Sequence, residues 1–248
     1  MSETINEATA AETERPAKNR IWELDFFRGV CILGVVIIHV VLDLLIFGVA
    51  SFTTPPVFNF IQQYGGILFI ILSGICVTLG HHPIRRGLIV FGCALVISVV
   101  TYIIFQNTYD MIWFGILHLL GCCMLLYPLL KRIPTAVLPA LGAVAIALGI
   151  WFARINVTVP FLFPLGLTTA TFGSSDWFPL FPHLGFFMFG IFIGRTLYKK
   201  QQTLFPNVNT QNPVIRFFSF CGRHSLWIYL GHQPISLGIM QLILLLRH

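Results

Sequence analysis

Four ionisable side chains lie within one apolar stretch of the sequence, residues 24–47: Asp25, Arg28, His39 and Asp43. Charged groups are costly inside a bilayer, and where they occur they face the interior of a helix bundle or a water-filled cavity. At 100° per residue the four side chains fall within a sector about 60° wide on one face of a helix. The opposite face carries Val, Ile and Leu. The stretch therefore predicts a membrane helix with a single polar stripe.

The spacing along this helix separates two groups of different chemistry. Arg28 and His39 are about 16 Å apart along the axis. Asp25 lies one turn from Arg28 and can pair with it. Asp43 lies one turn from His39, where a carboxylate can orient the imidazole or raise its basicity. The alternative is purely structural, with an Asp25–Arg28 pair and a histidine that is hydrogen-bonded to a neighbouring helix.

Two further histidines stand in apolar segments. His118 lies in "MIWFGILHLLG", about two turns into its span and at a depth close to that of His39. His232 is followed by Gln233 and Pro234 near the middle of the last span, where a proline frees a backbone carbonyl. Each alone is typical of an interhelical hydrogen bond, but together with the first helix they favour a functional pocket.

The composition is that of a polytopic membrane protein. Of 248 residues, 56% are hydrophobic and only 10% are charged, and the mean hydropathy is +0.85; soluble domains carry about 25% charged residues. The net charge of +6 comes mostly from loops, so it does not indicate a nucleic-acid partner. No His/Cys cluster has metal-ligand spacing, and no metal cofactor is predicted.

A helix needs about 20 apolar residues to cross a bilayer. We therefore expect an all-α, polytopic membrane helix bundle of about seven transmembrane helices, at residues 22–47, 57–80, 86–105, 112–131, 134–152, 180–198 and 223–246. Alternate loops are basic, which predicts a cytosolic N-terminus and a C-terminus outside. Residues 1–19 are expected to be a disordered cytosolic tail, and residues 20–248 a single transmembrane domain. The external segment 153–179 is rich in Pro, Gly and aromatic residues and could be re-entrant or interfacial.

The ordered motifs resemble a known family. Arg28 and His39 form an R-x10-H pattern, which is similar to that on the first helix of acyltransferase-3-type membrane acyltransferases. With "LSGICVTLG", "WFGILHLLG", "DWFPLFPHLGFFMFG" and "GRHSLWIYLGHQPI" in that order, residues 20–240 resemble the heparan-α-glucosaminide N-acetyltransferase catalytic-domain-like family. The resemblance implies acyl transfer, with acetyl-CoA or another acyl-CoA as co-substrate. The acceptor would be an extracytoplasmic glycan or small molecule, and the setting a bacterial inner membrane.

The resemblance implies a role for each polar residue of the first helix. Arg28 would meet a coenzyme A phosphate or pantetheine amide, beside Asp25 and the basic surface of Arg85, Arg86 and Arg223. His39 would act as general base with Asp43 holding its tautomer, and His118 or His232 would contact the thioester oxygen or the acceptor. The alternatives are a proton-coupled transporter and a scaffold without chemistry. Whether the chain forms a homo-oligomer is left open.

Overall fold

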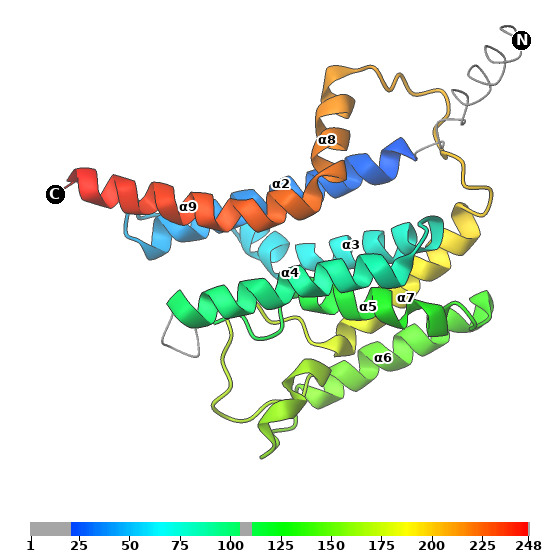
Figure 1. Ribbon diagram of the computed structural model, residues 1–248, viewed down its shortest axis with the longest axis horizontal. Coiled ribbons are helices and arrows are strands. Elements are labelled where there is room, and N and C mark those ends of the chain that lie inside the picture. Colours follow the sequence, from blue (N-terminus) through cyan, green and yellow to red (C-terminus); the bar gives the residue numbers. More distant parts are fainter. Residues whose placement is uncertain (1–20, 105–110, 248) are drawn as a thin grey trace, which may run out of the picture.

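The regular structure of the described residues is helical. The computed structural model describes residues 21–104 and 111–247, so the tail predicted for residues 1–19 lies outside them. The helices in chain order are α2 (Trp22–Ile46), α3 (Pro56–Leu79), α4 (Pro83–Ile104), α5 (Ile116–Leu130), α6 (Leu138–Phe152), α7 (Leu180–Leu197), α8 (Pro213–Arg223) and α9 (Ser225–Arg247) (Figure 1). Two short 3-10 helices are η1 (Thr135–Val137) and η2 (Pro160–Leu165). The predicted all-α bundle is confirmed.

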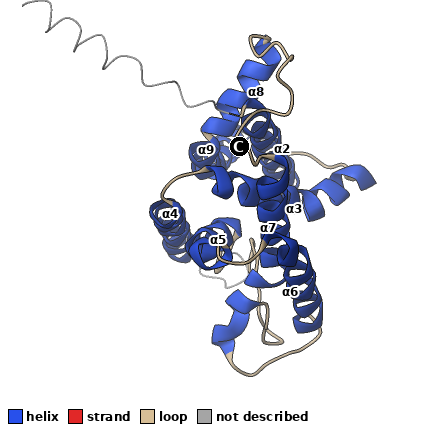
Figure 2. Cartoon of the chain, turned by 90° about the vertical axis from the view of Figure 1, so that its right-hand side faces the viewer, coloured by secondary structure: helices blue, strands red, loops and turns tan. Residues whose placement is uncertain are grey.

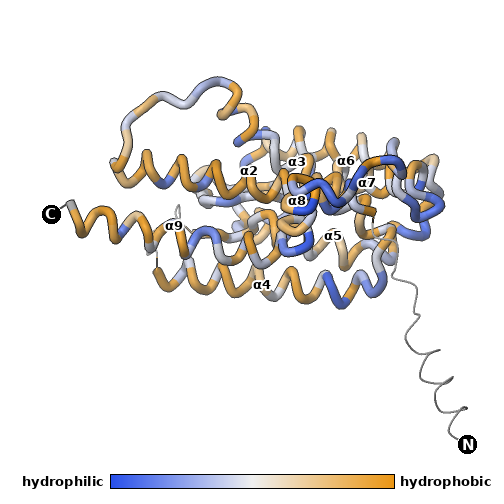
Figure 3. Tube along the Cα trace, turned by 90° about the horizontal axis from the view of Figure 1, so that it is seen from above, coloured by the Kyte–Doolittle hydropathy of each residue, from blue (hydrophilic) through white to orange (hydrophobic). Residues whose placement is uncertain are grey.

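Six helical units of the described chain are long and apolar enough to cross a membrane: α2, α3, α4, η1 with α6, α7 and α9. α5 has only 15 residues. Apolar residues predominate along all of these helices (Figure 3). The first residues of α2 and the last of α9 lie at opposite ends of the bundle (Figure 1). The chain is thus a multi-pass membrane protein, and the expectation of about seven spans is close.

α5 begins later than predicted, at residue 116 rather than 112. Residues 111–115 are irregular, with an isolated bridge between Phe114 and Trp177, and lie beside the segment that precedes α7, where Phe178 N donates to Phe114 O (2.9 Å) and Ser175 N donates to Met111 O (3.1 Å). This pairing uses backbone groups that a further helical turn would need. As a result, the end of the long 153–179 segment is fixed against the start of α5.

The core lies where α3, α5 and α7 meet, near the middle of the end-on view (Figure 2). Its fully buried side chains include Ile70, Leu119, Phe187 and Ile191. α6 packs on the outer side of α7, whereas α4 packs on α5 and α9 packs on α2. The histidine-bearing helices α2 and α9 are therefore neighbours.

α8 was not predicted, because residues 199–222 read as a loop. The sequence signal for the start of α8 spans only two residues. Asn212 accepts from Val214 N (2.9 Å) as an N-cap, and Pro213 occupies the first turn. α8 stands across the other helices and packs on α2 (Figure 1). Gly29 permits this contact, since a Cβ there would lie 1.9 Å from Phe218 O.

Candidate active site

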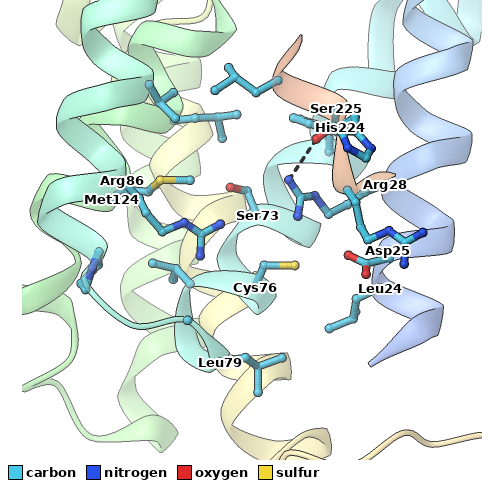
Figure 4. Close-up of a pocket in the computed structure, with 18 of the residues that line it drawn as sticks. Leu24, Asp25, Arg28, Ser73, Cys76, Leu79, Arg86, Met124, His224 and Ser225 are labelled. Atoms are coloured by element: carbon cyan, nitrogen blue, oxygen red, sulfur yellow. Dashed lines mark hydrogen bonds between the residues drawn. The ribbon is translucent and has the colours of Figure 1, made fainter. Parts of the chain in front are cut away.

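A cavity of about 1030 Å³ lies among the start of α2, the end of α3, the start of α4 and the junction of α8 with α9 (Figure 4). Among the residues that the structure describes, its charged lining residues are Asp25, Arg28, Arg86 and Arg223. Three guanidinium groups thus face one space together with a single carboxylate. Guanidinium groups bind phosphates in a bidentate manner, so the cavity has the chemistry of a site for a phosphate-bearing small molecule.

Arg28 is held toward this cavity by α9. Its Nη2 donates to Ser225 Oγ at 3.0 Å, and Ser225 is buried at the first residue of α9. Asp25, Ser73 and Cys76 lie around the same space (Figure 4). The predicted stripe therefore faces a cavity at its Arg28 end.

Arg85 and Arg86 are adjacent on α4 but line different pockets. Arg86 lines the cavity, and Gly80 leaves room for its head, because a Cβ at Gly80 would lie 2.5 Å from Arg86 Nη1. Arg85 instead lines a separate surface pocket, which is formed by residues 82–85 together with Leu88 and Ile89. Of the five residues predicted to hold the co-substrate, Arg85 is the one that the structure does not bring to the cavity.

The structure brings two of the predicted histidines together. The rings of His39 and His232 lie 4.8 Å apart, edge to face. His39 Nδ1 lies 2.9 Å from Val35 O, and His232 Nδ1 contacts Tyr229 O. A carbonyl oxygen can only accept, so both Nδ1 atoms carry the hydrogen and the Nε2 lone pairs are left available in the neutral rings. His232 Nε2 is buried without a hydrogen-bond partner in the described part of the chain.

Asp43 has a different set of contacts from the expected one. It accepts from Ser236 Oγ (2.5 Å) and from Gln233 Nε2 (3.2 Å), and these bonds tie α2 to α9. The ring of His39 is oriented by Val35 O rather than by Asp43. In this geometry a backbone carbonyl, rather than Asp43, fixes the hydrogen of His39 on Nδ1, and Asp43 ties together the two helices that carry both histidines.

His118 lies outside the histidine pair. Its Nδ1 accepts from Gly115 N (3.2 Å) and its Nε2 bonds Ser98 Oγ (3.2 Å), which itself donates to Ile112 O. Both ring nitrogens are therefore occupied. No ring contact or hydrogen bond within the described residues joins His118 to His39, so its geometry is that of a structural group linking α4 to α5.

Sequence reasoning missed two residues beside the histidine pair, Asp176 and Tyr229. Tyr229 lines the basic cavity, and its ring lies 5.3 Å from that of His232. The Tyr229 hydroxyl donates to Asp176 Oδ2 at 3.3 Å, and Ile116 N donates to the same oxygen at 3.2 Å. A signal was present, since Asp176 is the only acidic residue after position 110. Tyr229 connects the basic cavity to the histidines.

No group of three or more His, Cys, Asp or Glu side chains that could hold a metal ion occurs within residues 21–104 and 111–247. The expectation that the protein uses no metal stays a prediction.

The fold and this site define a multi-pass helical membrane protein in which a basic cavity leads to a histidine pair. The family model described as the catalytic region of heparan-alpha-glucosaminide N-acetyltransferase matches residues 20–234. The chain belongs to this family, as the ordered motifs predicted, and the family implies an N-acetyltransferase-type activity in the membrane. Acetyltransferases of this kind use acetyl-CoA as a co-substrate. Neither a curated protein nor a solved structure matches the chain.

Proposed function

We propose that the protein transfers an acetyl group from acetyl-CoA, bound in the basic cavity, to an amine or hydroxyl acceptor at His39. The observation that carries this proposal is the continuity of the two sites. Arg28, Arg86 and Arg223 line a cavity that Tyr229 also lines, and Tyr229 contacts His232, which contacts His39. The cavity volume of about 1030 Å³ is at the upper end for small-molecule sites, as a nucleotide with a long arm needs.

In the proposed reaction the coenzyme A phosphates lie beside the three arginines, and the pantetheine arm runs past Tyr229. His39 Nε2 takes a proton from the acceptor as its nitrogen or oxygen attacks the thioester carbonyl. The carbon–sulfur bond then breaks, and the thiolate of coenzyme A recovers the proton from the imidazolium. His39 is suited to this because its Nδ1 is already held as a donor by Val35 O.

The two ends of the path suggest an orientation. The start of α4, which carries Arg85, and the ends of α5 and α7, which Lys131 and Lys199 follow in the sequence, lie at the end of the bundle where α2 begins (Figure 1). Basic loops face the cytosol in bacterial inner membranes, and the proposal places the cavity there, with the acceptor arriving from the outer side. The acceptor is proposed to be an extracytoplasmic glycan or small amine or hydroxyl compound.

Two neighbouring arginines give a matched test of the binding half of this proposal. Acetyl-CoA at 100 times its Kd should stabilise the purified protein against heat by about 2.7 kcal/mol. Arg86→Ala should weaken acetyl-CoA binding about ten- to a hundredfold, because a hydrogen bond to a charged group contributes about 1.5–3 kcal/mol. Arg85→Ala removes the same charge outside the cavity and should bind almost as wild type. Equal losses in both variants would contradict the site.

The transfer half is tested at His39. His39→Ala should bind acetyl-CoA like the wild type but release no coenzyme A thiol with glucosamine as the acceptor probe. Near-normal thiol release would refute the role of His39. A protein that acetyl-CoA does not stabilise at all would instead fit the alternative of a proton-coupled transporter or a scaffold.

A further inference from the structure

Asp176 stands out among the carboxylates of the described chain. It comes from the 153–179 segment, yet it is fixed at the N-terminus of α5, where Ile116 N donates to its Oδ2 at 3.2 Å. The approach is close, because a Cβ at Gly115 would lie 2.1 Å from that oxygen. Burial raises the pKa of Asp176, while the Ile116 amide, the His39 charge and the Tyr229 hydroxyl lower it. A carboxyl kept in so confined a place costs stability, which is typical of a functional group.

The Asp176 carboxyl is connected to the histidine pair through Tyr229. Tyr229 donates to it at 3.3 Å, and the same tyrosine contacts His232, whose ring lies 4.8 Å from His39. Asp176, Tyr229, His232 and His39 thus form one continuous chain of side-chain contacts. The segment before α7 thereby adds an acid to a site whose histidines come from α2 and α9.

We propose that Asp176 is a positioning residue for acetyl transfer, whose carboxylate stabilises the imidazolium that His39 becomes after taking the acceptor proton. This inference rests on the proposed function, which assigns the proton to His39. The proton balance is unchanged: the acceptor loses it, His39 carries it, and the leaving thiolate receives it. Asp176 stays ionised throughout and supplies only the opposite charge, held in place by Ile116 and Tyr229.

Other titratable groups around His39 have other partners. On α9, His232 is a histidine and so supplies no negative charge, and the Tyr229 hydroxyl is hydrogen-bonded to Asp176. On α2 itself, Asp43 is bonded to Ser236 and Gln233. On the neighbouring α3, Tyr64 is 44% exposed and Cys76 lines the basic cavity near Arg28, and on α5 His118 bonds Gly115 and Ser98. Among these groups of the described residues, Asp43 is thus the competing carboxylate, and its charge is already shared by two donors.

The test uses Asp176→Asn in the full-length purified protein. Asparagine keeps an oxygen that can accept from Ile116 and Tyr229 and removes a confined charge, so the variant should fold; Asp176→Ser serves if it does not accumulate. We expect kcat with acetyl-CoA and glucosamine to fall about ten- to a hundredfold and KM for acetyl-CoA to stay unchanged, because the arginine cavity is untouched. The acid limb of kcat against pH should move down by about one pH unit.

A second readout does not depend on turnover. Diethyl pyrocarbonate labels the unprotonated imidazole, and mass spectrometry of the peptide that contains His39 gives the pH of half-maximal labelling. This midpoint should fall by about one pH unit in Asp176→Asn. Ser174→Ala is the matched control. Ser174 Oγ lies 3.0 Å from both Met111 O and Asp176 O and shares its one hydrogen between them, so its loss loosens the segment without removing a charge and should leave the midpoint unchanged.

The two proposals fail in different ways. A wild-type protein that transfers no acetyl group refutes the proposed function, whatever the labelling shows. A labelling midpoint for His39 that is the same in Asp176→Asn as in the wild type overturns the role of Asp176, even if transfer is intact. An equal shift in Ser174→Ala would overturn it as well, because the effect would then come from the position of the segment rather than from the charge.

Discussion

Replacing Gly29 by alanine should separate α8 from α2. An alanine Cβ there would lie 1.9 Å from Phe218 O and 2.7 Å from Phe218 C, well over 1 Å short of normal contact. Both atoms are backbone, so no side-chain rotation relieves the clash and the two helices must move apart. Overpacking of this kind costs about 1–3 kcal/mol or more, which exceeds the gain of up to about 1 kcal/mol from replacing a helical glycine.

The consequence extends to the basic cavity, because Arg28 precedes Gly29 on α2 and Arg223 ends α8. We expect Gly29→Ala to lower the midpoint of thermal unfolding in detergent and to weaken acetyl-CoA binding at least tenfold. Gly34→Ala is the control on the same helix, since a Cβ there meets nothing within 4 Å. It should leave binding unchanged and stability equal or slightly higher. If Gly29→Ala were as stable as Gly34→Ala, the close contact of α2 with α8 would be wrong.

Three further predictions concern other parts of the molecule. Glu23 is 1% exposed and accepts from Thr203 Oγ1 and Leu204 N, both at 2.8 Å. Glu23→Ala should therefore lower the free energy of unfolding by about 3 kcal/mol and expose residues 199–212 to limited proteolysis. Burial raises the pKa of Asp176 in the folded protein, so its contribution to stability is fully present below the unfolded pKa of about 4 and is lost as the pH rises through the folded value. The unfolding temperature of the wild type should accordingly fall relative to that of Asp176→Asn between pH 4 and pH 7, and a constant difference would refute this. His118→Ala should lower thermal stability, because both ring nitrogens are hydrogen-bonded, yet leave acetyl-CoA binding intact; a selective loss of binding would count against a structural role.

The helix positions could be predicted because they depend on local properties of the chain. Long apolar runs, and the polar stripe that includes Arg28 and His39, follow from helical periodicity and the cost of exposing charge to lipid. The start of α5 and the existence of α8 could not be predicted in this way. The first depends on pairing of residues 111–115 with a segment about 60 positions later, and the second on a glycine contact with α2.

The candidate site likewise has a part that the local sequence pattern predicts and a part that depends on packing. The sequence by itself determined a multi-pass helical protein of this acetyltransferase family, with Arg28 and His39 on one face of the first helix. Only the tertiary structure decided which distant groups join them, because contacts between helices depend on packing rather than on local pattern. The tertiary structure places Arg86 in the cavity and Arg85 outside it. It places His118 at the contact between α4 and α5, and it connects Asp176 to the histidines through Tyr229.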